Sequence, residues 1–439
     1  MLTILSILTI LSVVAFLIMG RGAPIIGLIL FPLLGAILAG FSPAEIGVFF
    51  TQGLGKVMQV ATMFIFAITF FGIMQDTGLF RPMINGMLAL TRGNVIAVTA
   101  GTALLGMLAH LDGAGATTFL LTVPALLPLY KKLKMSPYLM LMMLALGAGI
   151  LNMLPWAGPL GRASAATGIE VGTLWRPLIG VQIAGAVLLV ILAAVLGLRE
   201  KSRISAAGLN NDDATVDMHV DMKNQLPEED ESLFRPKLIW LNSIIFLGVL
   251  SALVIGFLPS AYIFMIGLSL ALLVNYPSLP MQMERIKAHA PNALMMGAII
   301  LAAGSFLGIM DGSGMLKSMA TDLVMVLPTA IVPHLHLILG VFGLPMELIL
   351  STDAYYFGLL PIVSQIVSVH GVEPSVTVYA LAIGNVVGTF ISPFSPALWL
   401  ALGLANLDIG QHIRYSIFWM WGFSITLLGV AIFLGVIPL

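Results

Sequence analysis

Two short segments, far apart in the chain, each place an aspartate among small and hydroxylated residues within otherwise apolar sequence. The first reads His110-Leu111-Asp112-Gly113-Ala114-Gly115-Ala116-Thr117-Thr118, and the second reads Leu350-Ser351-Thr352-Asp353-Ala354-Tyr355-Tyr356. Burying a carboxylate in a membrane is costly, so such a residue is by default a candidate for function. We predict that Asp112 and Asp353 bind a metal ion. The alternative is a carboxylate that caps a helix or is neutralised by a proton.

The residues around these aspartates suit an anionic ligand. Glycine lets a ligand approach the backbone closely, and the N-terminal amides of a helix starting near Thr117 can bind an anion. A titrating carboxylate or imidazole in the same place could also carry a proton. We predict substrate contacts at Gly113, Gly115, Thr117, Thr118, Ser351 and Thr352, and proton coupling at His110 and Asp353.

A second pair of segments, Gly147 to Pro159 and Gly384 to Pro396, is rich in glycine and proline. These residues interrupt helices and release backbone groups, which is tolerated at membrane depth only beside protein or a water-filled cavity. Neutral amides and hydroxyls there can bind a substrate. We predict substrate contacts at Asn152, Pro155, Gly158, Asn385, Thr389, Ser392 and Ser395. The alternative is a simple kink, or close helix packing through small residues.

The composition requires these segments to lie in a lipid bilayer. Hydrophobic residues make up 59% of the 439 residues and charged residues only 9%, whereas a soluble domain carries about 25% charged residues. Uncharged stretches such as Leu238 to Phe257 are long enough to cross a bilayer core of about 30 Å. The absence of cysteine excludes disulfides and thiolate metal sites, and the net charge of −1 argues against nucleic acid as a partner.

An internal repeat organises the crossings. Gly72-Ile73-Met74 followed by Asp76 recurs 236 residues later as Gly308-Ile309-Met310 followed by Asp311, and the two candidate aspartates are 241 residues apart. The first half contains five predicted crossings, near 2–19, 24–40, 54–75, 138–160 and 175–198, and a hairpin at 94–130 that enters and leaves on one side. An odd number of crossings inverts the second half, as in many secondary transporters. We predict an all-α polytopic membrane protein with two inverted repeats of five crossings, each with a re-entrant helical hairpin and a broken helix.

The predicted domains follow from this repeat. The first repeat covers residues 1–198, with scaffold helices in 1–75 and the hairpin and broken helix in 94–165. A polar linker at 199–237 separates it from the second repeat, 238–439, whose hairpin and broken helix lie in 334–408. With the N-terminus outside, 15 of the 19 Lys and Arg residues lie inside, the linker's included, which satisfies the positive-inside rule.

The same assignment leaves Lys56, Arg162, Arg176 and Lys317 outside, so almost no basic residue is predicted within the membrane. An anionic substrate would then be held by amides and hydroxyls while Asp112 and Asp353 repel it. A cation that travels with the anion removes this conflict, and oxygen ligands suit Mg²⁺ or Ca²⁺. Glu347 is a weaker candidate, as a proton carrier or as part of a polar face. Asp76 and Asp311, at the ends of crossings, are predicted to be interfacial.

The chain resembles the CitMHS family of bacterial transporters along nearly its whole length. The resemblance rests on Leu111 to Thr118, on Leu126-Leu127-Pro128-Leu129-Tyr130, and on Asn152-Met153-Leu154-Pro155-Trp156-Ala157-Gly158-Pro159. It implies a non-enzymatic symporter of the bacterial cytoplasmic (inner) membrane that takes up citrate with a divalent metal and protons and holds no resident cofactor. It also implies a homodimer whose hairpins and broken helices move as an elevator against a fixed scaffold. The family motif Asp-Gly-Asp-Gly departs here at Ala114, which puts the preferred ion in doubt.

Other functions remain alternatives on the sequence alone. A carrier of metal-free di- or tricarboxylates or of gluconate, coupled to Na⁺ or H⁺, would have a similar pattern of crossings. A channel is a further alternative. An intramembrane enzyme is a remote one, because the chain contains no His-Glu-x-x-His motif and no paired Asp-Asp-x-x-Asp motif.

Overall fold

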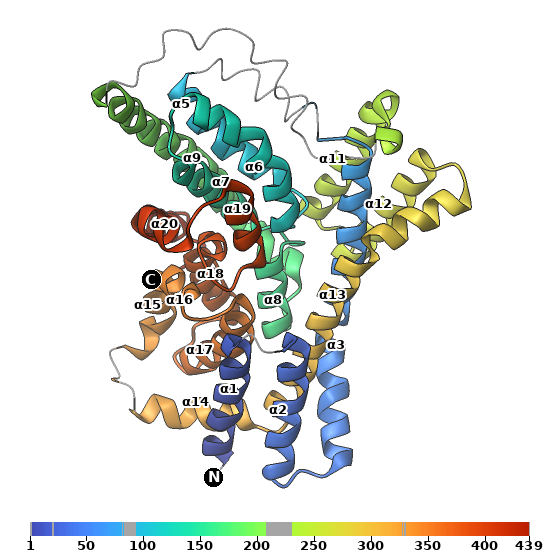
Figure 1. The fold of residues 1–439 in the computed structure, drawn as a ribbon. Coiled ribbons are helices and arrows are strands. Elements are labelled where there is room, and N and C mark those ends of the chain that lie inside the picture. The colour runs from blue at the N-terminus through green and yellow to red at the C-terminus, as the bar shows by residue number, and fades with distance from the viewer. Residues whose placement is uncertain are drawn as a thin grey trace.

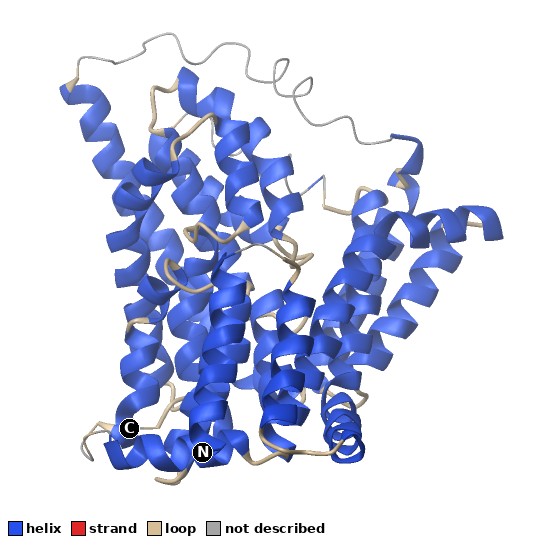
Figure 2. Cartoon of the chain, turned by 60° about the horizontal axis from the view of Figure 1, so that its bottom comes forward, coloured by secondary structure: helices blue, strands red, loops and turns tan. Residues whose placement is uncertain are grey.

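The computed structural model describes residues 2–19, 22–80, 82, 94–207, 231–326, 328 and 331–438, and within them it contains helices and no strand (Figure 2). The first half has α1 (Leu2–Met19), α2 (Pro24–Leu38), α3 (Pro43–Asp76), α5 (Val95–Ala109), α6 (Gly115–Lys132), α7 (Pro137–Leu151), α8 (Gly158–Thr167) and α9 (Val171–Ala206). After the short turns η1 (Glu231–Leu233) and η2 (Pro236–Leu238), the second half has α11 (Ile239–Ile255), α12 (Ser260–Asn275), α13 (Leu279–Gly312), α14 (Met315–Val326), η3 (Val332–His334), α15 (Leu335–Val341), α16 (Gly343–Glu347), η4 (Ala354–Leu359), α17 (Leu360–Ser368), α18 (Pro374–Asn385), η5 (Val386–Phe390), α19 (Pro396–Ala405) and α20 (Ile409–Phe433).

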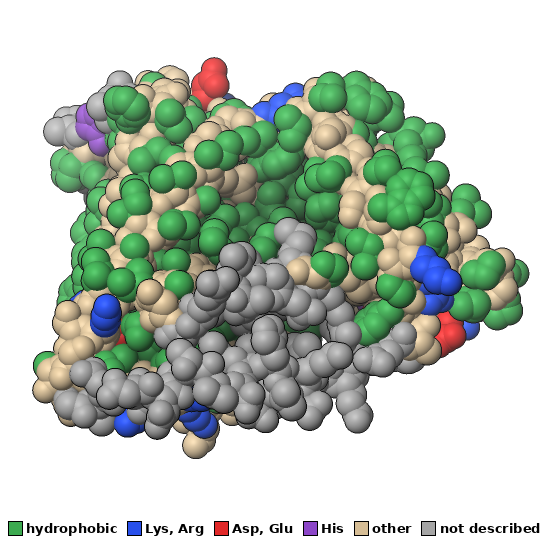
Figure 3. All heavy atoms as spheres, turned by 90° about the horizontal axis from the view of Figure 1, so that it is seen from above, with side chains coloured by type: hydrophobic (Ala, Val, Ile, Leu, Met, Phe, Trp, Pro, Cys, Tyr) green, Lys and Arg blue, Asp and Glu red, His purple; other side chains and the backbone are tan. Residues whose placement is uncertain are grey.

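Several of these helices are suited to a bilayer. Among the described residues, five helical segments are long and apolar enough to cross it: Pro43–Asp76, Val171–Ala206, Pro236–Ile255, Leu279–Gly312 and Ile409–Phe433. Many hydrophobic side chains also lie on the part of the face in Figure 3 that is drawn in colour. The chain is therefore a multi-pass, all-helical membrane protein, as predicted. Residues 208–230 of the predicted linker lie outside the described residues, and α9 extends through the start of that linker to Ala206.

The two longest scaffold candidates, α3 and α13, run antiparallel. Gly53 lies against Gly304 and Gly308, whereas Gly72, further along α3, lies against His289 near the start of α13. Residue numbers therefore rise along one helix as they fall along the other. Because α3 and α13 occupy equivalent positions in the two repeats, their opposite directions confirm that the second repeat is inverted.

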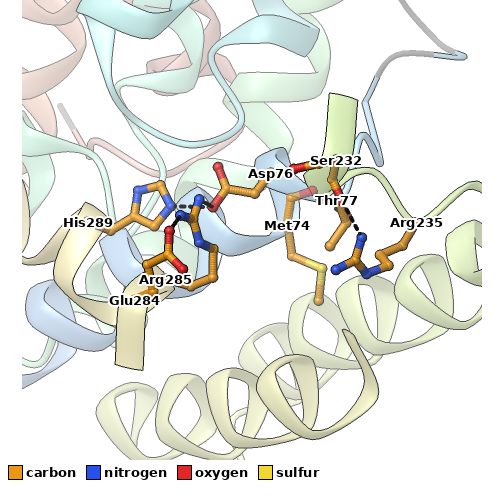
Figure 4. A network of polar contacts seen from close by, with 8 residues as sticks. All are labelled: Met74, Asp76, Thr77, Ser232, Arg235, Glu284, Arg285 and His289. Atoms are coloured by element: carbon orange, nitrogen blue, oxygen red, sulfur yellow. Dashed lines mark hydrogen bonds and ion pairs between the residues drawn. The ribbon is translucent and has the colours of Figure 1, made fainter. Parts of the chain in front are cut away.

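Ion pairs join α3 and α13 near both ends. The Asp76 carboxylate lies 2.8 Å from Nε2 of His289 and 3.6 Å from a guanidinium nitrogen of Arg285 (Figure 4). Towards the other end, Nζ of Lys56 lies 2.7 Å from the Asp311 carboxylate. Asp76 and Asp311 thus form ion pairs between the two helices, and their position at the membrane–water interface stays a prediction.

Glycine makes the close approach of α3 and α13 possible, and we expect Gly53→Ala to separate them. A Cβ atom at position 53 would overlap the Gly304 carbonyl oxygen and the Gly308 backbone, and backbone atoms cannot move aside as a flexible side chain can. Small residues at such crossings allow the packing that holds membrane helices together. The variant should have a lower melting temperature in detergent. Gly55→Ala, on the same helix with no neighbour within 4 Å of its Cβ position, is the control and should not be destabilised.

Apart from α1, α2 and α14, most of the helices fall into two groups (Figure 1). One side contains α3, α11, α12 and α13, and the other contains α5 to α9 and α15 to α20. Within the second group, Gly106 lies against Gly147, and Gly340 lies against Gly384. These contacts join α5 to α7 and α15 to α18. Each repeat therefore packs its hairpin on its broken helix through a pair of glycines at equivalent positions. Both hairpins and both broken helices belong to this group.

Candidate functional site

The first hairpin turns at the predicted aspartate motif. α5 ends at Ala109 and α6 begins at Gly115, two residues before the predicted start at Thr117. Gly113 has φ +73°, and a Cβ atom there would meet the Trp156 carbonyl oxygen at 3.1 Å. The Trp156 indole nitrogen donates a 2.7 Å hydrogen bond to the Leu111 carbonyl oxygen. A glycine is needed at position 113 because the turn packs closely against the first broken helix and adopts a left-handed conformation.

Asp112 bonds to residues at the start of α6. One carboxylate oxygen accepts a hydrogen bond from the Ala114 amide at 2.9 Å, and the other accepts one from the Thr117 hydroxyl at 2.5 Å. No side-chain hydrogen bond caps α6 at its N-cap residue, Ala114, so these two bonds do not make Asp112 the helix cap that the sequence raised as an alternative. Asp112 could still approach a ligand through its remaining lone pairs, but both of its oxygens already stabilise the hairpin turn. Its metal-binding role stays a prediction.

The second hairpin is built differently. Its first arm consists of the short helices α15 and α16, and its second arm begins at Thr352 and contains the π-helical segment η4 before α17. Such π segments occur often at functional sites. The carboxylate of Glu347, at the end of α16, is fully buried and accepts hydrogen bonds from the Thr352 hydroxyl at 2.7 Å and the Asn385 amide at 2.9 Å.

A matching arrangement surrounds His110 in the first repeat. His110 is fully buried, its Nδ1 lies 2.8 Å from the Thr118 hydroxyl, and its Nε2 lies 3.0 Å from the Asn152 side-chain oxygen. Each repeat therefore joins an ionisable residue of the hairpin's first arm to a threonine of the second arm and to the asparagine of the broken helix. His110 and Glu347, 237 residues apart, are the equivalent residues. The repeat offset of 236 takes His110 to Met346, one residue from Glu347, which the sequence analysis ranked as a weak candidate.

The broken helices bring the two halves together. α7 ends at Leu151 and α8 begins at Gly158, whereas α18 ends at Asn385 and α19 begins at Pro396. The Asn152 amide donates a 3.2 Å hydrogen bond to the Val386 carbonyl oxygen, and the Tyr356 hydroxyl donates a 3.1 Å hydrogen bond to the Asn385 oxygen. Both predicted asparagines are thus in the buried polar network where the interruptions of the two repeats meet.

The other predicted substrate residues serve mostly as local supports. The Ser392 hydroxyl donates to the Glu347 carbonyl oxygen at 2.6 Å, and the Thr389 hydroxyl donates to the Val386 carbonyl oxygen at 3.2 Å. Ser351 accepts a 3.2 Å hydrogen bond from the Ala354 amide. Pro155 is buried in the first break, Gly158 opens α8, Gly115 opens α6 against Phe390, and Ser395 precedes α19 without a side-chain capping bond.

The structure corrects the placement of one basic residue. Arg162 was predicted to lie outside, but its Nε atom donates a 2.6 Å hydrogen bond to an Asp353 carboxylate oxygen, and only 12% and 13% of the two side chains are exposed. α8 continues past the break and carries Arg162 back to the second hairpin. Arg162 therefore lies beside a predicted site residue, and an anion bound there would not depend on amides and hydroxyls alone.

The two predicted metal ligands have separate environments. Among the residues that the structure describes, Asp112 bonds within its own hairpin turn, whereas Asp353 bonds to α8 of the other repeat. In the described part of the chain, no group of three or more His, Cys, Asp or Glu residues is arranged to hold a metal ion. A cation bound at Asp353 would thus take most of its ligands from the substrate, from water or from backbone carbonyls.

Comparisons with known proteins agree with this architecture. The sequence model of the citrate transporter family CitMHS matches residues 2–384. Over the full length of both chains, this protein is 34% identical to the "Citrate transporter" of Bacillus subtilis and 34% identical to the "Mg(2+)/citrate complex secondary transporter" of the same organism. The crystal structure of the Alcanivorax borkumensis YdaH transporter matches with a TM-score of 0.58 at 14% identity, over 90% of this chain and 89% of that chain, and supports the fold alone. The chain therefore belongs to the CitMHS citrate transporter family, whose members are transporters and not enzymes.

Proposed function

We propose that this protein imports citrate as a complex with a divalent cation, together with protons, across the bacterial cytoplasmic membrane. The observation that carries the proposal is the repeated network in which His110 and Glu347 meet Asn152 and Asn385. Buried ionisable groups at the tips of two inverted hairpins are typical of a transport site. A relative with 34% identity is named a Mg²⁺/citrate complex secondary transporter. In this proposal, the site contacts Mg²⁺ or Ca²⁺ as part of the substrate.

The division into two groups of helices supports an elevator movement. We propose that the group with both hairpins moves against the group that contains α3 and α13, within a homodimer. A pocket of about 120 Å³ lies along this boundary. Most of its lining comes from α3, α13, α8 and α17, and it includes Gly53, Lys56, Leu307, Asp311, Thr167 and Ser364. Disulfide cross-linking of cysteine pairs across the boundary should trap different pairs in the presence and absence of substrate; identical cross-linking in every condition would contradict the movement.

Uptake into proteoliposomes tests the substrate. We expect radiolabelled citrate to accumulate when Mg²⁺ or Ca²⁺ is present outside, and EDTA to abolish the uptake because free citrate lacks the cation that balances the site's carboxylates. A protonophore should reduce accumulation driven by a pH gradient. Uptake of citrate that is indifferent to EDTA would remove the metal from the proposal, and no citrate uptake in any condition would remove citrate.

A metal-free carboxylate is a second candidate, and Arg162 is the observation that favours it. A guanidinium beside the second hairpin can bind a carboxylate directly without a cation. If the substrate is a metal-free di- or tricarboxylate or gluconate, uptake should persist in EDTA and depend on Na⁺ or on protons. Persistence in EDTA separates the two cases, and replacing external Na⁺ by choline in the same vesicles then distinguishes Na⁺ coupling from proton coupling of a metal-free carrier.

A further inference from the structure

The ion pair between Arg162 and Asp353 has unused binding capacity. Among the described residues, Arg162 donates a hydrogen bond only through Nε, and Asp353 accepts one only through Oδ1. The guanidinium carries five N–H donors. Among the described residues, the donors on its two terminal nitrogens have no protein acceptor, and the second carboxylate oxygen of Asp353 has no protein donor. A buried ion pair is stabilising only when its remaining donors and acceptors are satisfied. This pair can therefore bind a further anion at Arg162 and a further cation at Asp353.

The charges of the pair are complementary to those of a metal–carboxylate complex. Citrate binds a divalent cation through its hydroxyl and some of its carboxylates, and one carboxylate stays free. A carboxylate oxygen is a preferred ligand of Mg²⁺ and Ca²⁺, and a guanidinium binds a free carboxylate through two parallel hydrogen bonds. Resting on the function proposed above, we infer that Asp353 contacts the cation of the complex while Arg162 binds the carboxylate that the cation leaves free.

This arrangement explains how the site would distinguish the complex from its components. Free citrate would place negative charge beside Asp353 without a cation between them, and a free cation would lie beside Arg162 without an anion between them. Like charges brought together out of water repel strongly. A ligand with both charges can meet the second oxygen of Asp353 and the terminal nitrogens of Arg162 at the same time, so we assign the specificity for the free carboxylate to Arg162 and that for the cation to Asp353.

Gly158 provides the space for the guanidinium. A Cβ atom at position 158 would lie 2.6 Å from an Arg162 terminal nitrogen, and the next nearest side chain, Met296, is 3.8 Å away. Gly158→Ala should therefore displace the end of the Arg162 side chain without removing either charge. This variant alters the position of the proposed carboxylate contact and leaves the ion pair in place.

Binding to the purified full-length protein tests the inference. The probes are Mg²⁺–citrate and Mg²⁺–citramalate; citramalate has a methyl group where citrate carries one of its carboxymethyl arms. The wild-type protein should bind the citrate complex about tenfold more tightly, because a charge-assisted hydrogen bond to the extra carboxylate contributes about 1.5 kcal/mol or more. In Arg162→Gln this preference should disappear while binding of both complexes still requires Mg²⁺. Gly158→Ala should reduce the preference, and Arg176→Gln, an exposed arginine, should retain it.

Removing Arg162 leaves Asp353 unpaired and can unfold the protein, so Arg162→Lys is the second variant. Lysine keeps a cation beside Asp353 but lacks the planar fork, and the preference should fall severalfold in a folded protein. A preference that survives in Arg162→Lys and in any folded Arg162→Gln protein overturns the inference and leaves the proposed function intact. A wild-type protein that neither binds nor transports a citrate complex overturns both.

Discussion

Asp353→Asn is expected to abolish metal-dependent citrate uptake, by roughly 100-fold or more, in a protein that remains folded. The loss of a charged ligand weakens cation binding strongly, and even outer partners of a metal ligand contribute about 10- to 100-fold. Asparagine keeps the oxygen that accepts the hydrogen bond from Nε of Arg162, so the contact between α8 and the second hairpin is retained. Uptake of radiolabelled citrate into proteoliposomes, at a series of Mg²⁺ concentrations, measures the effect.

The control for this prediction is Asp311→Asn. Asp311 also pairs with a basic residue, Lys56, but about half of each side chain is exposed, and exposed pairs contribute little. Its uptake should stay close to that of the wild type. Unchanged metal-dependent transport by Asp353→Asn would remove Asp353 from the site, whereas an unfolded Asp353→Asn protein would show that its negative charge is structural.

Glu347→Ala should cause the second large effect, with loss of uptake and a marked fall in melting temperature. Glu347 is fully buried, and its removal leaves the Thr352 hydroxyl and the Asn385 amide without their acceptor. Each buried donor left unpaired costs about 1–3 kcal/mol, and the missing side chain leaves a cavity besides. The second hairpin should lose its attachment to the broken helix and with it the position of Asp353.

The variant Glu347→Gln distinguishes a role of Glu347 in positioning the second hairpin from a role of its charge. Glutamine can accept from Asn385 and donate to the Thr352 hydroxyl, so the melting temperature should recover most of what alanine loses. If Glu347 only positions the hairpin, uptake should recover with stability. If it also carries a proton, the stable glutamine variant should bind the citrate complex but no longer respond to a pH gradient. Glu284→Ala, at an exposed position on α13, is the control, and a melting temperature equal to that of Glu347→Ala would contradict the structural role.

The repeated motifs were sufficient to predict the hairpins and the broken helices. Glycine and proline at equivalent distances in both halves are local features, and their effect on the backbone is the same wherever the helices pack. The aspartates also marked the hairpins, since Asp112 lies at the first turn and Asp353 lies at the start of the second arm of the second hairpin. Their partners were not predictable in this way. Asp112 bonds to residues two and five positions away, whereas Asp353 bonds to Arg162 across 191 residues.

By itself the sequence determined that this is a helical, multi-pass transporter built from two repeats. It also determined that polar, glycine- and proline-rich segments interrupt the helices. Hydrophobicity, helix breakers and repeat spacing can all be read from the order of residues along the chain. Only the tertiary structure decided which residues of the hairpins and broken helices contact one another. It placed Arg162 beside Asp353, linked Asn152 to the Val386 carbonyl oxygen, and made Glu347 the counterpart of His110. Those contacts depend on how α8 and the second hairpin fold back on each other, and a count of basic residues on each side of the membrane contains no information about that.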